Sequence, residues 1–202
     1  YLAKGYDLNR QPDAALKELT SAKRTDPADP TPWLYSALVK RDQNRINDAI
    51  GDLEESKRLN DNRYLFRSRA LLDQDRAVRS ANLAGLYRDA GMTDVSVREA
   101  TAAVTSDYGN ASAHLFLANS YDALRDPRQI TLRYETPWLN ELLIAQLMQP
   151  VGGGSLSQTV SQQEYSRLFQ QNGVGLFSLT QYSSQGDFIE SASQYGSFGN
   201  TD

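Results

Sequence analysis

The chain has 202 residues and a formal net charge of −4, which gives it enough length for an apolar core and argues against non-specific binding of nucleic acid. It has no cysteine, so a thiol nucleophile, a disulfide and a thiolate metal site are excluded. Its one histidine, His114, has no second histidine or paired nucleophile in view, so composition offers little support for catalysis.

Segments of the chain match one another, in two pairs, at a spacing of 34 residues. The matched positions are Tyr6, Ala15 and Leu19 with Lys40, Ala49 and Leu53, and Leu83, Ala84 and Tyr87 with Leu117, Ala118 and Tyr121. A fixed period of this length is typical of one helix-turn-helix unit per repeat, and such a unit must stack on its neighbours to bury its apolar face. The pattern favours a binding surface over a catalytic pocket.

Over residues 1–126 the repeat resembles the tetratricopeptide pattern. The residues that carry the resemblance are Leu2, Ala3, Tyr6, Ala15, Leu19, Ala22 and Pro27 in the first unit, Trp33, Ala37, Ala49, Leu53 and Leu59 in the second, Leu83, Ala84, Tyr87, Gly91, Ala100 and Ala103 in the third, and Leu117, Ala118 and Tyr121 in the fourth. Small side chains such as Ala37, Ala84 and Ala118 let the first helix of a unit approach the second closely. The resemblance implies a mainly α solenoid of helix-turn-helix units that binds a protein or peptide without a cofactor.

Two departures from the pattern mark the middle of the array. Lys40 stands where the pattern has tyrosine, and the step from Ala37 to Ala84 is 47 residues, one repeat plus an insertion of 13. The insertion falls within 61–78, and 69–90 reads as helix, so we expect the first helix of the third unit to be extended at its start. Tyr1 falls part-way through the first helix of its unit, and we expect the sequence to be a piece of a longer chain.

One concentration of basic residues allows two interpretations. It consists of Arg63, Arg67, Arg69, Arg76 and Arg79. A functional interpretation is an anion or phosphate site. However, Asp75 precedes Arg79 by four residues and Asp73 precedes Arg76 by three, spacings that pair opposite charges along a helix. These spacings favour a solvated face that neutralises its own charge.

The sequence predicts no catalytic or metal site, and we expect the protein not to be an enzyme. His114 occupies the helix position that Trp33 holds in the second unit, which favours a packing or half-exposed residue over a proton-transfer role. Glu54 and Glu55 are adjacent in sequence, so on a helix they do not face each other and are expected to be solvated.

The repeat register predicts which residues line the concave face of the solenoid. They are Leu34, Leu38 and Arg41 in the second unit, Ala81, Gly85 and Arg88 in the third, and Leu115, Asn119 and Asp122 in the fourth, with Lys4 and Asp7 in the first. Only Asn119 matches the set by which chaperone-adaptor repeats hold a C-terminal carboxylate. We expect an extended peptide or a protein to bind here. The alternative is a wetted surface, with the true contact on an edge or on the convex face.

Residues 127–150 are expected to form a capping or linker helix. Thr136 followed by Pro137 is a helix-start signal, the next ten or so residues are mostly apolar, and Pro150 ends the run. Such a helix requires burial, either as the missing second helix of the fourth unit or against another domain. A dozen residues rise only about 18 Å, which is too short to span a hydrocarbon core of about 30 Å.

Residues 151–202 form a third segment, rich in Ser, Gln and Gly. Three glycines at 152–154 lack the strand and Lys-Ser/Thr helix of a phosphate loop and indicate a linker. Residues 161–164 match a capping box, which predicts a short helix before Gly173 with Tyr165, Leu168 and Phe169 on one face. Residues 176–183 and 188–198 are predicted to be two antiparallel strands that pair with something outside this segment.

The order of repeats, linker helix and Tyr/Phe/Gly/Ser/Gln-rich strands also resembles bacterial envelope proteins whose periplasmic repeats precede an outer-membrane β-barrel. This resemblance implies a non-enzymatic scaffold at the periplasmic face of the outer membrane, with the barrel in the same longer chain. Two alternatives remain open. One is a polysaccharide-export protein whose repeats recruit a modifying enzyme to a barrel pore. The other is a soluble cytoplasmic adaptor with a disordered tail.

Overall fold

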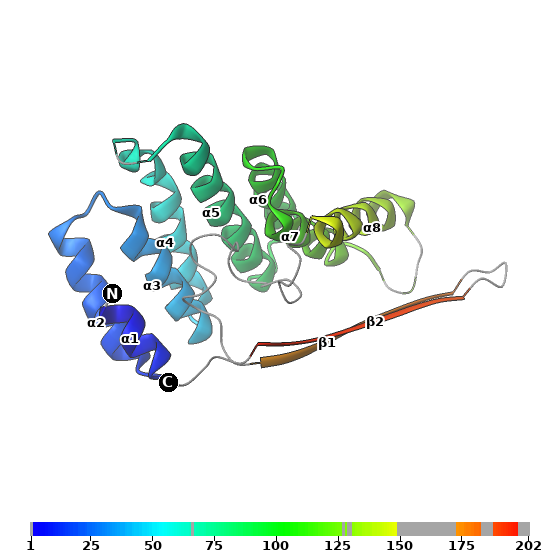
Figure 1. Cartoon of the computed structure of the whole chain (residues 1–202), viewed down its shortest axis with the longest axis horizontal. Coiled ribbons are helices and arrows are strands. Elements are labelled where there is room, and N and C mark those ends of the chain that lie inside the picture. The colour runs from blue at the N-terminus through cyan, green and yellow to red at the C-terminus, as the bar shows by residue number, and fades with distance from the viewer. Residues whose placement is uncertain are drawn as a thin grey trace.

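The computed structural model describes residues 2–65, 67–126, 128 and 131–148, together with the backbone of 173–182 and 188–197. Within these residues the helices are α1 (Leu2–Leu8), α2 (Pro12–Thr25), α3 (Pro30–Asp42), α4 (Ile46–Arg58), the 3-10 helix η1 (Asn60–Arg63), α5 (Arg69–Asp89), α6 (Thr93–Ser106), α7 (Ala111–Asp122) and α8 (Leu132–Leu147). The α-helices form four pairs, which stack in chain order (Figure 1).

The turns inside the first three pairs share one backbone geometry. Arg10, Asn44 and Gly91 have positive φ angles of 56°, 60° and 79°. They lie 34 and 47 residues apart, the same steps by which the sequence repeats. In each turn the next residue donates its N–H to the carbonyl five residues back, at 2.7 to 2.8 Å, which satisfies the end of the first helix. The repeat in sequence is therefore a repeat in backbone conformation.

The main core runs through the first three pairs. Leu19 of α2, Leu34 of α3, Leu53 of α4 and Leu83 of α5 are buried in one apolar cluster. Smaller clusters continue through α6, α7 and α8. The alanines expected between the two helices of a unit, Ala37, Ala84 and Ala118, are fully buried.

The last part of the insertion is helical and extends the start of α5, as the sequence predicts. The helix anticipated over 69–90 is α5, whose 21 residues exceed the 13 of α3. Its extra turns are at the start, where the Ser68 side chain accepts a hydrogen bond from the Leu71 N–H at 3.4 Å. The rest of the insertion contains η1, after which Tyr64 and Leu65 are exposed.

The start of α8 corrects the sequence prediction. The helix begins at Leu132, and Pro137 lies inside it, although Thr136-Pro137 was expected to be its start. The Thr131 carbonyl accepts the N–H groups of Tyr134 and Glu135 at 2.9 and 3.0 Å, which closes an earlier turn. That turn is held by tertiary contacts, because the Arg125 guanidinium lies 3.4 Å from Glu135 and 4.0 Å from the centre of the Trp138 ring.

Helix α8 takes the place of the second helix of the fourth unit. Leu142 and Ala145 are buried against Leu115 and Ala118 of α7. The helix therefore caps the repeat stack, which is the first of the two positions expected from the sequence. Among the described helices, none combines the length and the apolar character needed to cross a bilayer.

The described backbone after α8 forms two strands, β1 (Gly173–Tyr182) and β2 (Phe188–Ser197). They pair antiparallel from Gly173 with Ser197 to Tyr182 with Phe188, and no third strand joins this sheet within the described residues. A partner for this hairpin stays a prediction. The glycine linker at 152–154 and the short helix expected after the capping box at 161–164 lie outside the described residues.

Candidate functional site

Of the nine residues that the second, third and fourth units contribute to the predicted concave face, five are buried in the helix stack. They are Leu34, Leu38, Ala81, Gly85 and Leu115. Leu34 and Leu38 belong to the main core cluster, and α5 packs directly on α7, so these positions contact neighbouring side chains instead of solvent. A Cβ atom on Gly85 of α5 would lie 2.8 Å from the Phe116 ring of α7. These five residues therefore belong to the core and correct the predicted lining.

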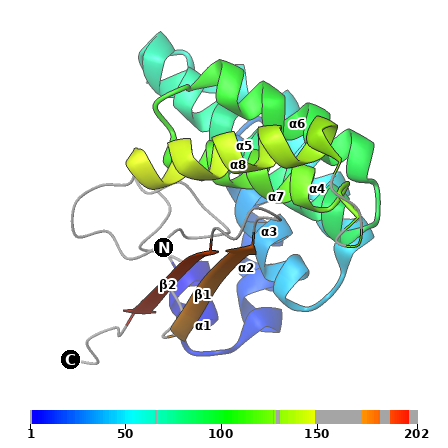
Figure 2. The same cartoon turned by 90° about the vertical axis from the view of Figure 1, so that its right-hand side faces the viewer.

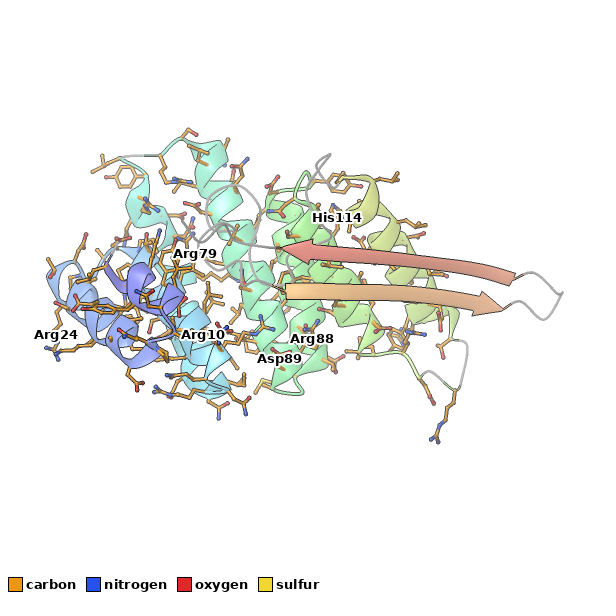
Figure 3. All side chains as sticks on the ribbon, turned by 60° about the horizontal axis from the view of Figure 1, so that its bottom comes forward. Arg10, Arg24, Arg79, Arg88, Asp89 and His114 are labelled. Atoms are coloured by element: carbon orange, nitrogen blue, oxygen red, sulfur yellow. The ribbon has the colours of Figure 1, made fainter. Side chains whose placement is uncertain are left out.

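The other four residues of that prediction, Arg41, Arg88, Asn119 and Asp122, keep solvent-accessible side chains. Arg41 of α3 donates two hydrogen bonds, from Nε at 3.0 Å and Nη2 at 2.7 Å, to Asp89 of α5. Arg88 lies 3.4 Å from the same carboxylate, and Figure 3 shows this Arg-Asp pair at the end of α5. The charges here hold neighbouring units together.

An open groove of about 930 Å³ lies between α1, α2 and α3. Its apolar lining includes Leu19, Ala22, Pro32, Tyr35 and Val39. Its charged lining consists of Lys4, Asp7, Glu18, Asp26, Asp29 and Arg63. We call this feature the α1–α3 groove. Its shape and mixed lining suit a segment of polypeptide, which has an apolar side and polar groups to satisfy.

The sequence pointed to only part of this groove. Lys4 and Asp7, the first-unit residues of the predicted concave face, both line it. Most of the remaining lining comes from α2 and from the start of α3. The predicted lining used positions on the first helix of each unit, whereas α2 is the second helix of the first unit.

Charges in the α1–α3 groove are held by local contacts. The Lys4 ammonium lies 4.8 Å from the centre of the Tyr35 ring, and Asp29 accepts the Thr31 N–H at 2.9 Å as the cap of α3. Burial raises the pKa of Asp7 above its ordinary value, and the neighbouring charge of Asp42 raises it further. With four acidic and two basic residues, the lining is acidic on balance.

Next to this region, the unusual Lys40 has a clear structural role. Lys40 of α3 and Lys23 of α2 lie 2.5 and 3.0 Å from the Asp52 carboxylate of α4, and Ser36 also donates to it at 2.6 Å. Burial by itself would raise the pKa of Asp52, but the hydrogen bonds from Lys40, Ser36 and Lys23 outweigh burial and hold that pKa below its usual value. The lysine that departs from the repeat pattern thus links three helices.

The arginine concentration is paired as predicted, but it is not all solvated. Arg79 and Asp75 lie 4.0 Å apart, and Arg76 lies 3.4 Å from Asp73, at the expected spacings. Arg79, labelled in Figure 3, has no exposed surface and donates to Ser56 at 3.0 Å and Asn60 at 2.7 Å.

The prediction of a solvated face is therefore wrong for Arg79 and Asp75. Ser56 of α4 and Asn60 of η1 lie against the Arg79 side chain. Arg67 also pairs with Asp75, at 2.9 Å.

His114 is a buried connection between α7 and α8. Its Nδ1 lies 2.6 Å from the Glu141 carboxylate and its Nε2 lies 2.8 Å from the Tyr108 carbonyl. The sequence predicted either a packing residue or a half-exposed one. The side chain is 0% exposed, so His114 is a packing residue and the half-exposed alternative is wrong. A solvent-borne substrate has no access to this imidazole. Over the described ranges, no group of three or more His, Asp or Glu side chains could hold a metal ion.

Comparison with known proteins supports the fold. No family model and no curated protein matches the chain. Two solved structures, a MamA double mutant from strain RS-1 and MamA 41-end from Desulfovibrio magneticus RS-1, each match with a TM-score of 0.56 and 14% identity, covering 74% of this chain and 72% of theirs. YrrB, described as a TPR protein with an unusual peptide-binding site, matches with a TM-score of 0.30, 14% identity, and coverage of 73% and 83%. The stack of helix pairs is therefore a fold that this chain shares with the two MamA structures.

Proposed function

We propose that this chain is a non-enzymatic scaffold for protein–protein interactions, and that the α1–α3 groove is where it takes a segment of its partner. The observation that carries the proposal is the groove itself, a cavity of about 930 Å³ between three helices of a repeat stack. Repeat stacks with such extended surfaces commonly bind polypeptide. The partner is a protein or a peptide.

The chemistry of the groove fits an amphipathic segment that carries basic residues. Leu2, Ala3 and Ala22 offer accessible apolar surface to one side of such a segment, while Glu18 and Asp26 offer carboxylates to the other. Burial of apolar side chains supplies the affinity, and the charges select the sign of the partner.

The placement of the polar groups supports binding over catalysis. His114 is enclosed, and Arg41, Arg79 and Asp52 join one helix to another. Catalysis by any of these groups would require contact with a substrate, and each already contacts a neighbouring helix.

We further propose that the stack is tethered at the periplasmic face of an outer membrane. The support is the order of elements, a repeat stack followed by strands of ten residues each, a length typical of barrel strands at about 9 to 11 residues. The test is fractionation of the parent protein, which we expect to remain with the membranes. Recovery of the intact parent in the soluble cytosolic fraction would favour the cytoplasmic adaptor instead.

The groove is tested by placing a photo-crosslinking amino acid at Thr25 in the parent protein inside cells. Thr25 lines the groove, whereas Thr20 on the same helix does not. Both are exposed, and both hydroxyls donate to the carbonyl four residues back. We expect a discrete protein adduct from position 25 and none from position 20. Equal adducts from the two positions would contradict groove binding.

A further inference from the structure

One proton lies between α7 and α8, in the contact that His114 makes with Glu141. The Nε2 atom of His114 lies 2.8 Å from the Tyr108 carbonyl, which can only accept a hydrogen bond, so Nε2 carries a hydrogen. The Nδ1 atom lies 2.6 Å from the Glu141 carboxylate. Two acceptors at that distance repel each other unless a proton lies between them. The imidazole and the carboxyl group therefore share one proton, whichever atom holds it.

The two partners in this contact differ in their access to water. The His114 side chain is fully buried, whereas the Glu141 side chain is 20% exposed. When the proton leaves, the lone pair of Nδ1 faces an ionised carboxylate inside the stack. The carboxylate can turn to water, but the imidazole cannot, and a buried acceptor without a donor is unfavourable. Loss of the proton therefore favours a movement of α8 away from α7, which lets water reach Nδ1.

The other elements around His114 bring no charge that replaces this proton, within the part of the chain that the structure describes. The last seven residues of α6 are uncharged, and α5 meets α7 with Ala81 and Gly85. In the loop before α7, the Asp107 carboxylate lies beside Gly109. The Tyr108 ring stands edge-on to the imidazole, with the ring centres 4.9 Å apart. Glu141 is thus the charged side chain that bonds to the imidazole.

The first half of α8 is held by contacts that do not depend on this proton. Glu135 lies 3.4 Å from Arg125, and an arginine keeps its charge over the whole working pH range of proteins. The other charged residue in this half, Arg133, is exposed. The two halves of α8 should therefore respond differently to pH.

We propose that this proton controls the end of the repeat stack: the second half of α8 stays docked on α7 while His114 and Glu141 share the proton, and it undocks when a rise in pH removes it. The apolar contacts in that half are those of Leu142 and Ala145 with α7. In the view of Figure 2, α8 lies across the front of the helix stack. The described strands follow α8 in the chain, so undocking loosens the connection between them and the repeat pairs.

The first test is hydrogen exchange of the full, untagged chain at pH 6 and at pH 9, with each rate corrected for the intrinsic effect of pH on exchange. We expect protection over 141–147 to fall at least about tenfold relative to α4, while protection over 132–136 changes no more than that of α4.

Two variants separate the shared proton from other effects of pH. Glu141→Gln should keep the second half of α8 docked at both pH values, because its amide N–H donates to the unprotonated Nδ1. Tyr108→Phe is the matched control, since it removes the phenol but keeps the ring and the carbonyl, and it should respond to pH as the unaltered chain does. Circular dichroism checks that both variants keep their helices.

The second test follows the proton itself and needs only the unaltered chain. His114 is the only histidine, so a single imidazole signal in the NMR spectrum reports its protonation. We expect this signal to titrate at the same pH at which protection over 141–147 is lost. Protection that does not change with pH, a change that persists in Glu141→Gln, or a titration at a clearly different pH would overturn the proposal.

Discussion

The first three helix pairs and the fourth are built by different means. In the first three, a tight turn with one left-handed residue joins the helices, and Arg10, Asn44 and Gly91 fill that position. In the fourth, Arg125 stands at the equivalent position without a positive φ angle, and α8 starts only at Leu132.

The contacts across the fourth pair come from particular side chains. They include Arg125 on Trp138 and His114 with Glu141. Where the repeat is intact, a shared turn geometry joins the two helices of a pair. Where the repeat ends, long-range side-chain contacts take over that role. The regular part is therefore sensitive to changes in its shared turn and its interhelix contacts, and the last pair to the loss of single side chains.

The largest effect is expected from Asp52→Asn in the regular part. This substitution leaves Lys23 and Lys40 without their carboxylate, and losing one partner from a buried ionic group costs about 3 kcal/mol. Denaturant unfolding measures the loss, with the exposed Lys17→Ala as a near-neutral control. A change below that of the control would mean that this cluster does not hold the three helices.

The same cluster predicts a pH dependence. The pKa of Asp52 is lower in the folded state than its ordinary value of 3.8, so the unfolded state binds the proton more readily. Its stabilisation is complete above that ordinary value and is lost as the pH falls through the folded pKa. Stability measured from pH 6 downward should therefore fall less steeply in Asp52→Asn than in the unaltered chain. Parallel curves would contradict this.

The next effect tests the close approach of α5 and α7, where the regular part meets the last pair. Gly85→Ala places a Cβ atom 2.8 Å from the buried Phe116 ring and should cost about 2 kcal/mol through overpacking. Gly51→Ala on α4 is the matched control, because its Cβ meets no atom within 4 Å, and it should stabilise by about 0.5 kcal/mol. Thermal melts of the two variants should shift in opposite directions, and shifts in the same direction would place the contact elsewhere.

The shared turn can be broken directly. Gly91→Ala forces a side chain into the left-handed region at φ 79° and should cost about 1 kcal/mol. Asn44→Gly at the equivalent position should be neutral or slightly stabilising, because glycine adopts this conformation freely. Equal stability of the two variants would show that the turn geometry is not a constraint.

Sequence reasoning worked best where structure is local. The 34-residue spacing predicted the helix pairs, and the reading of 69–90 as helix predicted the extension of α5. It failed where distant contacts decide. Thr136-Pro137 is a strong local start signal, yet Arg125 stabilises an earlier turn through Glu135 and Trp138.

The burial of the predicted concave-face residues could not be read from the sequence for a similar reason. The repeat register fixes which side of a helix Ala81 and Gly85 occupy, but not how closely α7 approaches it. Phe116 of α7 fills that space, and no pattern in the sequence measures the distance between the two helices. Arg79 is the polar counterpart, since its burial depends on how the insertion folds over it.

The smallest effect is expected in the last pair. Arg125→Gln removes the guanidinium from the Trp138 ring, 4.0 Å away, and should cost about 0.5 to 1 kcal/mol. The loss should be local, so hydrogen exchange should speed up over 132–136 and stay unchanged in α3 and α4. Unchanged exchange at the start of α8 would mean that another contact holds that turn.

The central claim, that the α1–α3 groove binds a partner segment, is tested most directly by blocking the groove. A photo-crosslinking residue at Ser21, which lines the groove, reports occupancy in the parent protein, and the yield of its adduct is compared between Thr25→Trp and Thr20→Trp. Both threonines are exposed on α2, but only Thr25 lines the groove, so Thr25→Trp should lower the yield at least about tenfold while Thr20→Trp leaves it unchanged. Equal yields in the two variants would contradict the claim.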